Sequence, residues 1–169
     1  FPRTYEQNKI FGKLTWQLKP NLQLGQSFND EFWVNPTIPT LVTPFVATQR
    51  WNARVPAMTF SHLTHTLSPN TLWDVRVGRF VYSRHDDPST GSFTTASRTD
   101  RFTGITRDAP PQIGGLTLIR TNAKATLSHY QRRLLGGNHS WKMGGEIEKG
   151  EHRQPLVIPT GIRYTDDNG

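Results

Sequence analysis

Two carboxylates two residues apart, Glu146 and Glu148, have the best spacing in this sequence for acid–base chemistry. Side chains two residues apart on a β-strand point to the same face, so both carboxylates would lie beside Lys142. The same alternation places Asp74 and Arg76 together on another predicted strand. Ion pairing or solvation in a polar interior is the simplest role for these five residues, and we expect no catalytic residue among them.

The other candidates for metal binding or catalysis are weaker. His62 and His65 are three residues apart, so on a strand they point to opposite faces and are poorly placed to share a metal ion. The sequence His85-Asp86-Asp87 falls in a predicted loop, where solvation is its simplest role. Because Cys is absent, disulfides and thiol chemistry are excluded. We therefore predict that the chain is not an enzyme and holds neither a metal nor a cofactor.

Three β-hairpins carry the charged residues, and the clearest spans residues 50–84. Both of its halves are rich in Val, Thr and aromatic residues, and Ser68-Pro69-Asn70 forms the turn between them. Similar hairpins are expected at residues 8–34 and 121–149. Residues 123–135 also fit a helix, so that part of the third hairpin has two interpretations.

Long irregular segments separate these hairpins, at residues 35–49, 85–120 and 150–169. Loops longer than about 15 residues are uncommon inside a compact soluble domain. Short turns at one end and long loops at the other are typical of transmembrane β-barrels. The pattern therefore predicts an all-β fold, with antiparallel up-and-down hairpins forming a section of a transmembrane β-barrel.

The aromatic residues fall into two groups along these strands. One group lies within five residues of a tight turn and comprises Trp16, Trp73 and Trp141. The other group lies near the far ends of the strands and comprises Trp33, Trp51 and Tyr82. We expect the two groups to form aromatic girdles at the two interfaces of a membrane. The alternative is that these rings fill the core of a β-sandwich.

Three positions fit the alternation poorly. Pro56 lies within a predicted strand and removes a hydrogen-bond donor, which predicts either a bulge there or a position outside the bilayer. Arg79 falls on the apolar face unless Gly78 shifts the register. The register near the third turn is also ambiguous, because the neighbours Leu134 and Leu135 cannot both face the same side.

Composition limits the classes that remain. Only 34% of the 169 residues are hydrophobic, and there is no run of 18 apolar residues that would predict a transmembrane helix. The net charge of +7 comes from scattered single Lys and Arg residues, so we expect no nucleic-acid binding. Because the sequence starts at Phe1 and shows no signal peptide, we expect a mature chain or an excised piece.

Six predicted strands are too few to close a transmembrane barrel, which needs at least about eight. The residues from Phe11 to Asn21, His65 to Gly78 and Gly137 to Glu146 resemble successive hairpins of TonB-dependent outer-membrane receptors, most closely the Oar-like group. The resemblance implies a barrel of about 22 strands with a plug domain that is absent from this chain. It also implies a location in the outer membrane of a Gram-negative bacterium.

If the resemblance holds, the chain contacts outer-membrane lipid, the remaining strands and the plug of its parent protein. The TonB complex would drive uptake of an external substrate through that parent. The five charged residues would face the lumen and contact the plug or the substrate. A soluble β-sandwich binding module, for a ligand such as carbohydrate, is the main alternative, and a secreted β-architecture enzyme is a third.

Overall fold

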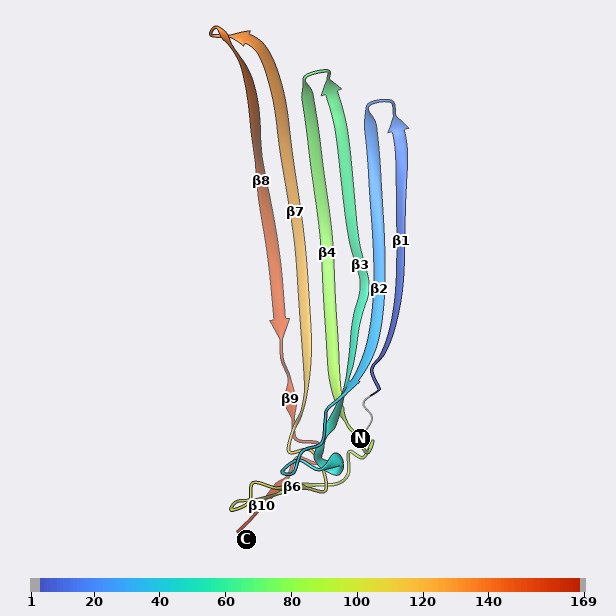
Figure 1. The fold of residues 1–169 in the computed structure, drawn as a ribbon, viewed down its shortest axis with the longest axis vertical. Helices are drawn as coiled ribbons and strands as arrows, with labels where there is room; N and C mark the ends of the chain where they lie inside the picture. Colours follow the sequence, from blue (N-terminus) through green and yellow to red (C-terminus); the bar gives the residue numbers. More distant parts are fainter. Residues whose placement is uncertain (1–3, 168–169) are drawn as a thin grey trace.

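The computed structural model describes residues 4–167. Six long strands form one antiparallel sheet in the order β1-β2-β3-β4-β7-β8, standing side by side in Figure 1. Their bounds are β1 Glu6–Lys19, β2 Leu22–Pro36, β3 Gln49–Ser68, β4 Thr71–Pro88, β7 Ile113–Leu134 and β8 Gly137–Arg153. The expected all-β fold of antiparallel up-and-down hairpins is confirmed, and the described residues do not close the sheet into a ring.

The strands are longer than the alternation predicted. The hairpin expected at residues 121–149 spans Ile113–Arg153, and residues 123–134 lie in β7, so the strand interpretation was correct and the helix was wrong. The loop expected at residues 85–120 is reduced to 89–112, because β4 and β7 stay paired as far as His85 and Gly115. Pairing with a neighbour extends a strand through Gly-containing sequence that has little propensity of its own.

The segments at the open end of the hairpins fold into a compact cap. The cap contains the 3-10 turn η1 (Phe45–Ala47) and a small sheet of β10 (Arg163–Asp166), β5 (Ser97–Asp100) and β6 (Thr106–Arg107). β9 (Leu156–Val157) pairs with β7. The tail expected to be a loop at residues 150–169 thus contributes two short strands, and β10 runs parallel to β5.

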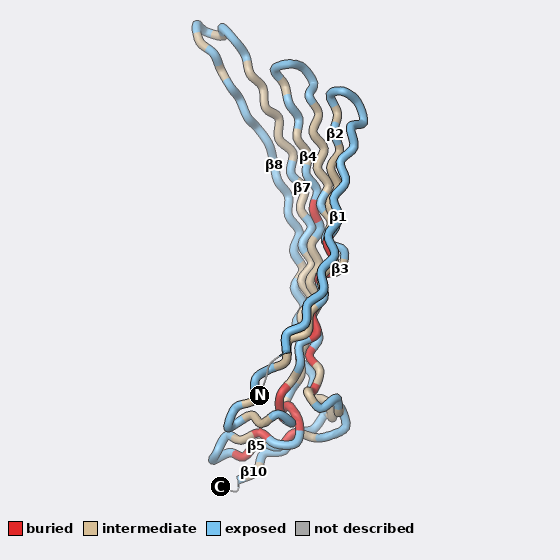
Figure 2. The backbone as a smooth tube through the Cα atoms, turned by 45° about the vertical axis from the view of Figure 1, so that its right-hand side comes forward, coloured by how far each residue is buried: buried red, intermediate tan, exposed pale blue. Residues whose placement is uncertain are grey.

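Buried residues are few and most lie toward the cap, although Figure 2 also shows buried positions midway along the sheet. The buried hydrophobic residues are Ala47, Ala53, Val55 and Ala109. Most of the six-stranded sheet is a single layer with both faces accessible. None of the described residues forms a helix long and apolar enough to cross a membrane.

Successive hairpins are staggered in one direction. The carbonyl of Asn21 in the first tight turn accepts the N–H of Thr66 at 2.8 Å, and the carbonyl of Asn70 accepts the N–H of Tyr130 at 2.8 Å. Each turn therefore stops short of the next hairpin, which gives the staircase of turns in Figure 1. A stagger of this kind is required when tilted strands build the wall of a barrel.

A β-bulge interrupts β3 at Pro56, so the first of the two interpretations of this residue was correct. Pro56 and Ala57 together stand opposite the single residue Asp30 of β2, and Ala57 has a φ of 51°. The extra residue reverses the alternation, so Arg54 before the bulge and Thr59 after it point to the same face.

The other two doubtful positions are now defined. The register between β4 and β7 is continuous around Arg79, so Gly78 shifts nothing and Arg79 stays on the apolar face. Near the third turn the register shifts between Gln131 and Leu134, where Arg133 has a φ of 56°. This register shift changes the alternation just before Leu134, which resolves the conflict between Leu134 and Leu135.

Candidate functional site

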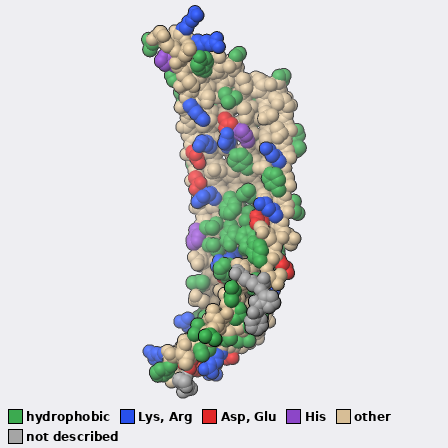
Figure 3. Space-filling model, viewed as in Figure 1, with side chains coloured by type: hydrophobic (Ala, Val, Ile, Leu, Met, Phe, Trp, Pro, Cys, Tyr) green, Lys and Arg blue, Asp and Glu red, His purple; other side chains and the backbone are tan. Residues whose placement is uncertain are grey.

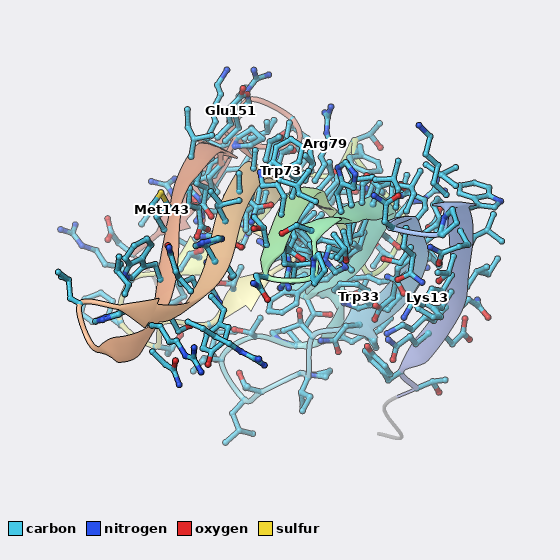
Figure 4. The ribbon with its side chains drawn as sticks, turned by 90° about the horizontal axis from the view of Figure 1, so that it is seen from above. Lys13, Trp33, Trp73, Arg79, Met143 and Glu151 are labelled. Atoms are coloured by element: carbon cyan, nitrogen blue, oxygen red, sulfur yellow. The ribbon has the colours of Figure 1, made fainter. Side chains whose placement is uncertain are left out.

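The long sheet has two faces that differ in composition. Seen along the strands, it forms an arc from whose convex side Trp73, Arg79, Met143 and Glu151 point outward (Figure 4). Trp33 points from the concave side. Directly paired residues share a face, so the register extends this division to every strand. We call these the convex face and the concave face.

The convex face is apolar and uncovered. Ile10 is 69% exposed, Met143 62% and Ile147 73%, although large hydrophobic side chains are normally buried. Its apolar side chains occur on all six strands: Ile10, Leu14, Trp16, Leu24, Phe28, Phe32, Leu63, Trp73, Val75, Val77, Val81, Ile119, Ala123, Leu127, Trp141, Met143 and Ile147. A continuous exposed patch of this kind marks an interaction surface.

The tryptophans near the tight turns all lie on the convex face. Trp16, Trp73 and Trp141 are 46%, 39% and 44% exposed. They lie on β1, β4 and β8, and each is close to the turn of its own hairpin. The structure therefore brings the first aromatic group onto one face, next to the apolar residues.

The second aromatic group lies on the concave face, opposite to the first group. Trp33 and Tyr82 meet on the concave face with their ring centroids 5.7 Å apart. The guanidinium carbon of Arg84 lies 4.7 Å from the ring centroid of Trp51, also on the concave face. Alternation along β2 and β4 places Trp33 and Tyr82 on the face opposite to the convex residues of the same strands. The bulge in β3 places Trp51 on this concave face as well.

All five charged candidates lie on the concave face. Arg76 Nε lies 2.8 Å from Asp74 Oδ1 on β4. Glu146 on β8 pairs with Lys124 at 3.2 Å, and Glu148 pairs with Arg120 at 3.3 Å. Lys142 stands opposite Ser128. Figure 3 views this face and shows charged side chains of both signs over the upper part of the sheet, above an apolar patch nearer to the cap.

The register between neighbouring strands, rather than proximity in the sequence, brings these charged residues together. Arg76, Lys124 and Glu146 form one row across three adjacent strands. Glu146 and Glu148 each have a cation partner and are about half exposed. The arrangement is therefore an ion-paired polar wall, and no group of three or more His, Asp or Glu among residues 4–167 is placed to hold a metal ion.

His62 is the concave-face residue whose role the sequence did not reveal. Its Nε2 contacts Asp74 Oδ2, and Thr64 Oγ1 lies 3.2 Å from the same nitrogen. His65 points to the convex face, so the expectation that the two histidines separate was correct. Pairing of His62 with Asp74 depends on the register between β3 and β4, which no short motif in the sequence specifies.

Two buried carboxylates organise the cap. Asp86 lies at the end of β4, not in a loop as expected, and its Oδ1 is 3.0 Å from Arg84 Nε. Burial raises the pKa of Asp86 despite that cation. Asp100 Oδ1 accepts the N–H groups of Phe102 at 2.8 Å and Thr103 at 3.0 Å. These backbone donors, led by Thr103, lower the pKa of Asp100.

The sheet as a whole can hold an apolar medium against one face and water with ions against the other. The charged residues occupy the upper part of the concave face, and the exposed tryptophans border the apolar residues of the convex face. No family model, curated protein or solved structure matches this chain.

Proposed function

We propose that this chain is part of the wall of an outer-membrane β-barrel, belonging to a TonB-dependent receptor that takes up an external substrate. The convex face contacts lipid, and the concave face lines the lumen and meets the plug domain or the substrate. The resemblance of the three hairpins to such receptors supports the receptor class. The contrast between the two faces supports the barrel.

The observation that carries the proposal is the exposure of the convex face. A soluble sheet covers its apolar face with a second layer, because exposed apolar surface in water is unfavourable. Here the described residues place no second layer over Ile10, Met143 or Ile147, all more than half exposed. Ion pairs extend over the opposite face, whereas those of the convex face lie toward the cap. An apolar exterior with a polar interior is the arrangement of a membrane barrel.

The dimensions of the apolar band agree with a membrane. On the convex face of β4 the apolar residues run from Trp73 to Val81, which are eight residues apart. At about 3.3 Å per residue and a tilt of about 40°, eight residues cover about 20 Å, close to the apolar band of about 25 Å in outer-membrane barrels. The cap then lies outside the band, on the side opposite to the tight turns.

The missing part of the barrel is expected at the two free edges. Within residues 4–167 each of β1 and β8 pairs with one neighbour only. Unpaired strand edges are not tolerated in hydrocarbon, so the parent protein would supply further strands on both sides. β1 and β8 run in opposite directions, so an even number of added strands closes the ring.

Single-tryptophan variants can test which face meets lipid. In each of five variants one tryptophan is kept and the others are replaced by Phe, and the chain is refolded into vesicles containing brominated phosphatidylcholine. We expect strong fluorescence quenching of Trp16, Trp73 and Trp141, whose rings face the convex side. Trp33 and Trp51 serve as matched controls and should be quenched weakly.

Equal quenching of all five tryptophans would contradict the proposed division of faces. A chain that stays monomeric in buffer without detergent and does not bind vesicles would contradict a membrane location. That second result would favour the soluble β-sandwich binding module, since such a module needs no lipid to cover its apolar residues.

A further inference from the structure

Arg79 is the one cation of β4 that lies among the apolar residues of the convex face. It follows Val77 and precedes Val81 on the same side of the strand, and the register there is continuous. Among residues 4–167 it forms no ion pair. An arginine facing lipid is tolerated when its guanidinium reaches the interface, because the long stem can extend along apolar surface.

The depth of Arg79 allows this extension. It lies six residues beyond Trp73, about 15 Å along the membrane normal at 3.3 Å per residue and a tilt of about 40°. Arg79 is also two residues, or about 5 Å along the membrane normal, from Val81, the last apolar residue of the convex face on β4. The arginine stem can span this distance, so the guanidinium of Arg79 can reach the lipid headgroups on the side of the cap.

Two further cations lie on the same face at the same end. Lys149 is in the row of Arg79, separated from it only by Thr121. Lys149 Nζ lies 3.4 Å from Glu151, and Arg153 lies 3.5 Å from the same carboxylate. Arg79, Lys149 and Arg153 carry three positive charges and Glu151 one negative charge, so this group keeps two positive charges (3 − 1 = 2).

The other convex-face charges near the cap give no positive excess, because Glu6 on β1 adds a negative charge to two ion pairs. Arg54 pairs with Asp30 at 2.8 Å, and Arg50 pairs with Asp87 at 3.8 Å. The excess positive charge is therefore confined to the part of the face formed by β4, β7 and β8. The side chains of Lys149 and Arg153 are 80% and 76% exposed, so they are open to a ligand.

We infer that Arg79, Lys149 and Arg153 form a binding site for the phosphate group of an anionic lipid in the leaflet on the side of the cap. Guanidinium groups bind phosphate oxygens in a bidentate manner, and Lys adds a point charge. The lipid phosphate lies at the boundary toward which Arg79 extends. This inference rests on the proposed membrane location of the convex face.

Vesicle flotation of the full chain with two matched double variants tests the site. Arg79→Gln with Lys149→Gln removes two cations from the convex face, and Lys9→Gln with Lys13→Gln removes two from the concave face of β1. Binding is measured to vesicles of neutral phosphatidylcholine and to vesicles that also contain phosphatidylglycerol. Circular dichroism in neutral vesicles checks that each variant keeps its β structure.

We expect the convex double variant to bind phosphatidylglycerol vesicles about 30-fold more weakly than the concave one, given about 1 kcal/mol for each basic residue near an anionic surface. Binding to neutral vesicles should be as strong as that of the unmodified chain. Inorganic phosphate, compared with chloride at equal ionic strength, should not compete. Equal losses for both double variants, or competition by free phosphate, would overturn the lipid-phosphate site.

The two proposals fail in different ways. If the unmodified chain binds neither kind of vesicle, the proposed membrane location is wrong and the lipid site is wrong with it. If the unmodified chain binds both kinds and the convex double variant behaves like the concave one, only the lipid site is wrong.

Discussion

Trp33 on β2 and Tyr82 on β4 meet across the intervening strand β3, with ring centroids 5.7 Å apart and ring planes at 37°. The residue of β3 that pairs with Trp33 is Ala53, which is 1% exposed. A small side chain at this position lets the two rings approach, because a larger one would stand between them. The bulge at Pro56 is what places Ala53, rather than Arg54, on the concave face.

Enlarging Ala53 is expected to destabilise the sheet. Ala53→Leu adds volume to a fully buried position beneath the two rings, and such overpacking typically costs about 1–3 kcal/mol. The free energy of unfolding is measured by urea titration of the chain in vesicles. Ala123→Leu is the control, because Ala123 lies on the convex face and should accept the larger side chain in lipid. Equal stability of the two variants would contradict this packing.

Replacing Ala57 by Gly is expected to stabilise the chain. Ala57 has a φ of 51°, and a left-handed conformation costs a residue with a Cβ about 1–2 kcal/mol. Gly adopts it without that cost, although it loses more backbone entropy, so a net gain of up to about 1 kcal/mol is expected. Ala125→Gly in the regular part of β7 should instead lower the free energy of unfolding by about 0.5–1 kcal/mol. A loss of stability in Ala57→Gly would show that the bulge has a different backbone.

Adjacent glycines of β8 should respond differently to a methyl group. A Cβ on Gly144 would press against the carbonyl oxygen of Ala125 and lie 2.8 Å from Thr126 Cγ2, whereas a Cβ on Gly145 meets nothing within 4 Å. We expect Gly144→Ala to lower the free energy of unfolding by about 1–3 kcal/mol. Gly145→Ala is the control, with neutral or slightly increased stability on the convex face. Urea titration of both variants distinguishes the two, and a neutral Gly144→Ala would contradict the close pairing of β7 and β8.

The cap should loosen at low pH because of Asp100. The folded-state pKa of Asp100 lies below its ordinary value of 3.8, so its ionised form stabilises the cap above that pH. The stabilisation is lost as the pH falls from 3.8 through the lowered pKa. Hydrogen exchange at the amides of Phe102 and Thr103, which donate to this carboxylate, reports the change after correction for intrinsic exchange.

Two substitutions separate the charge of Asp100 from its hydrogen bonds. Asp100→Asn keeps an oxygen acceptor for both amides, so hydrogen exchange at these amides should increase much less at low pH than in the unmodified chain. Asp100→Ala removes the acceptor, so exchange should be fast at every pH. Asp86 should show the opposite pH dependence. Because its pKa is raised, its contribution to the stability of the fold becomes less favourable as the pH rises above 3.8. A steep acid dependence in Asp100→Asn would assign the effect to another group.

Much of the local structure was predictable from residues that are close in sequence. Pro-Asn turns at residues 20–21 and 69–70 and the turn at 136–138 predicted the three hairpins, because turn geometry is a local property. Period-two alternation placed Asp74 with Arg76, and Lys142 with Glu146 and Glu148, since it depends only on the strand itself. Pro56 likewise predicted a bulge, because a missing N–H is a property of one residue.

The tertiary structure decided everything that depends on the register between strands. The side to which Trp51 points follows from the single extra residue of the bulge, which reverses the alternation for the rest of β3. His62 contacts Asp74, and β10 pairs in parallel with β5. No local sequence pattern predicts either pairing. Hydrogen bonds between strands set these relationships, so they exist only once the sheet has formed.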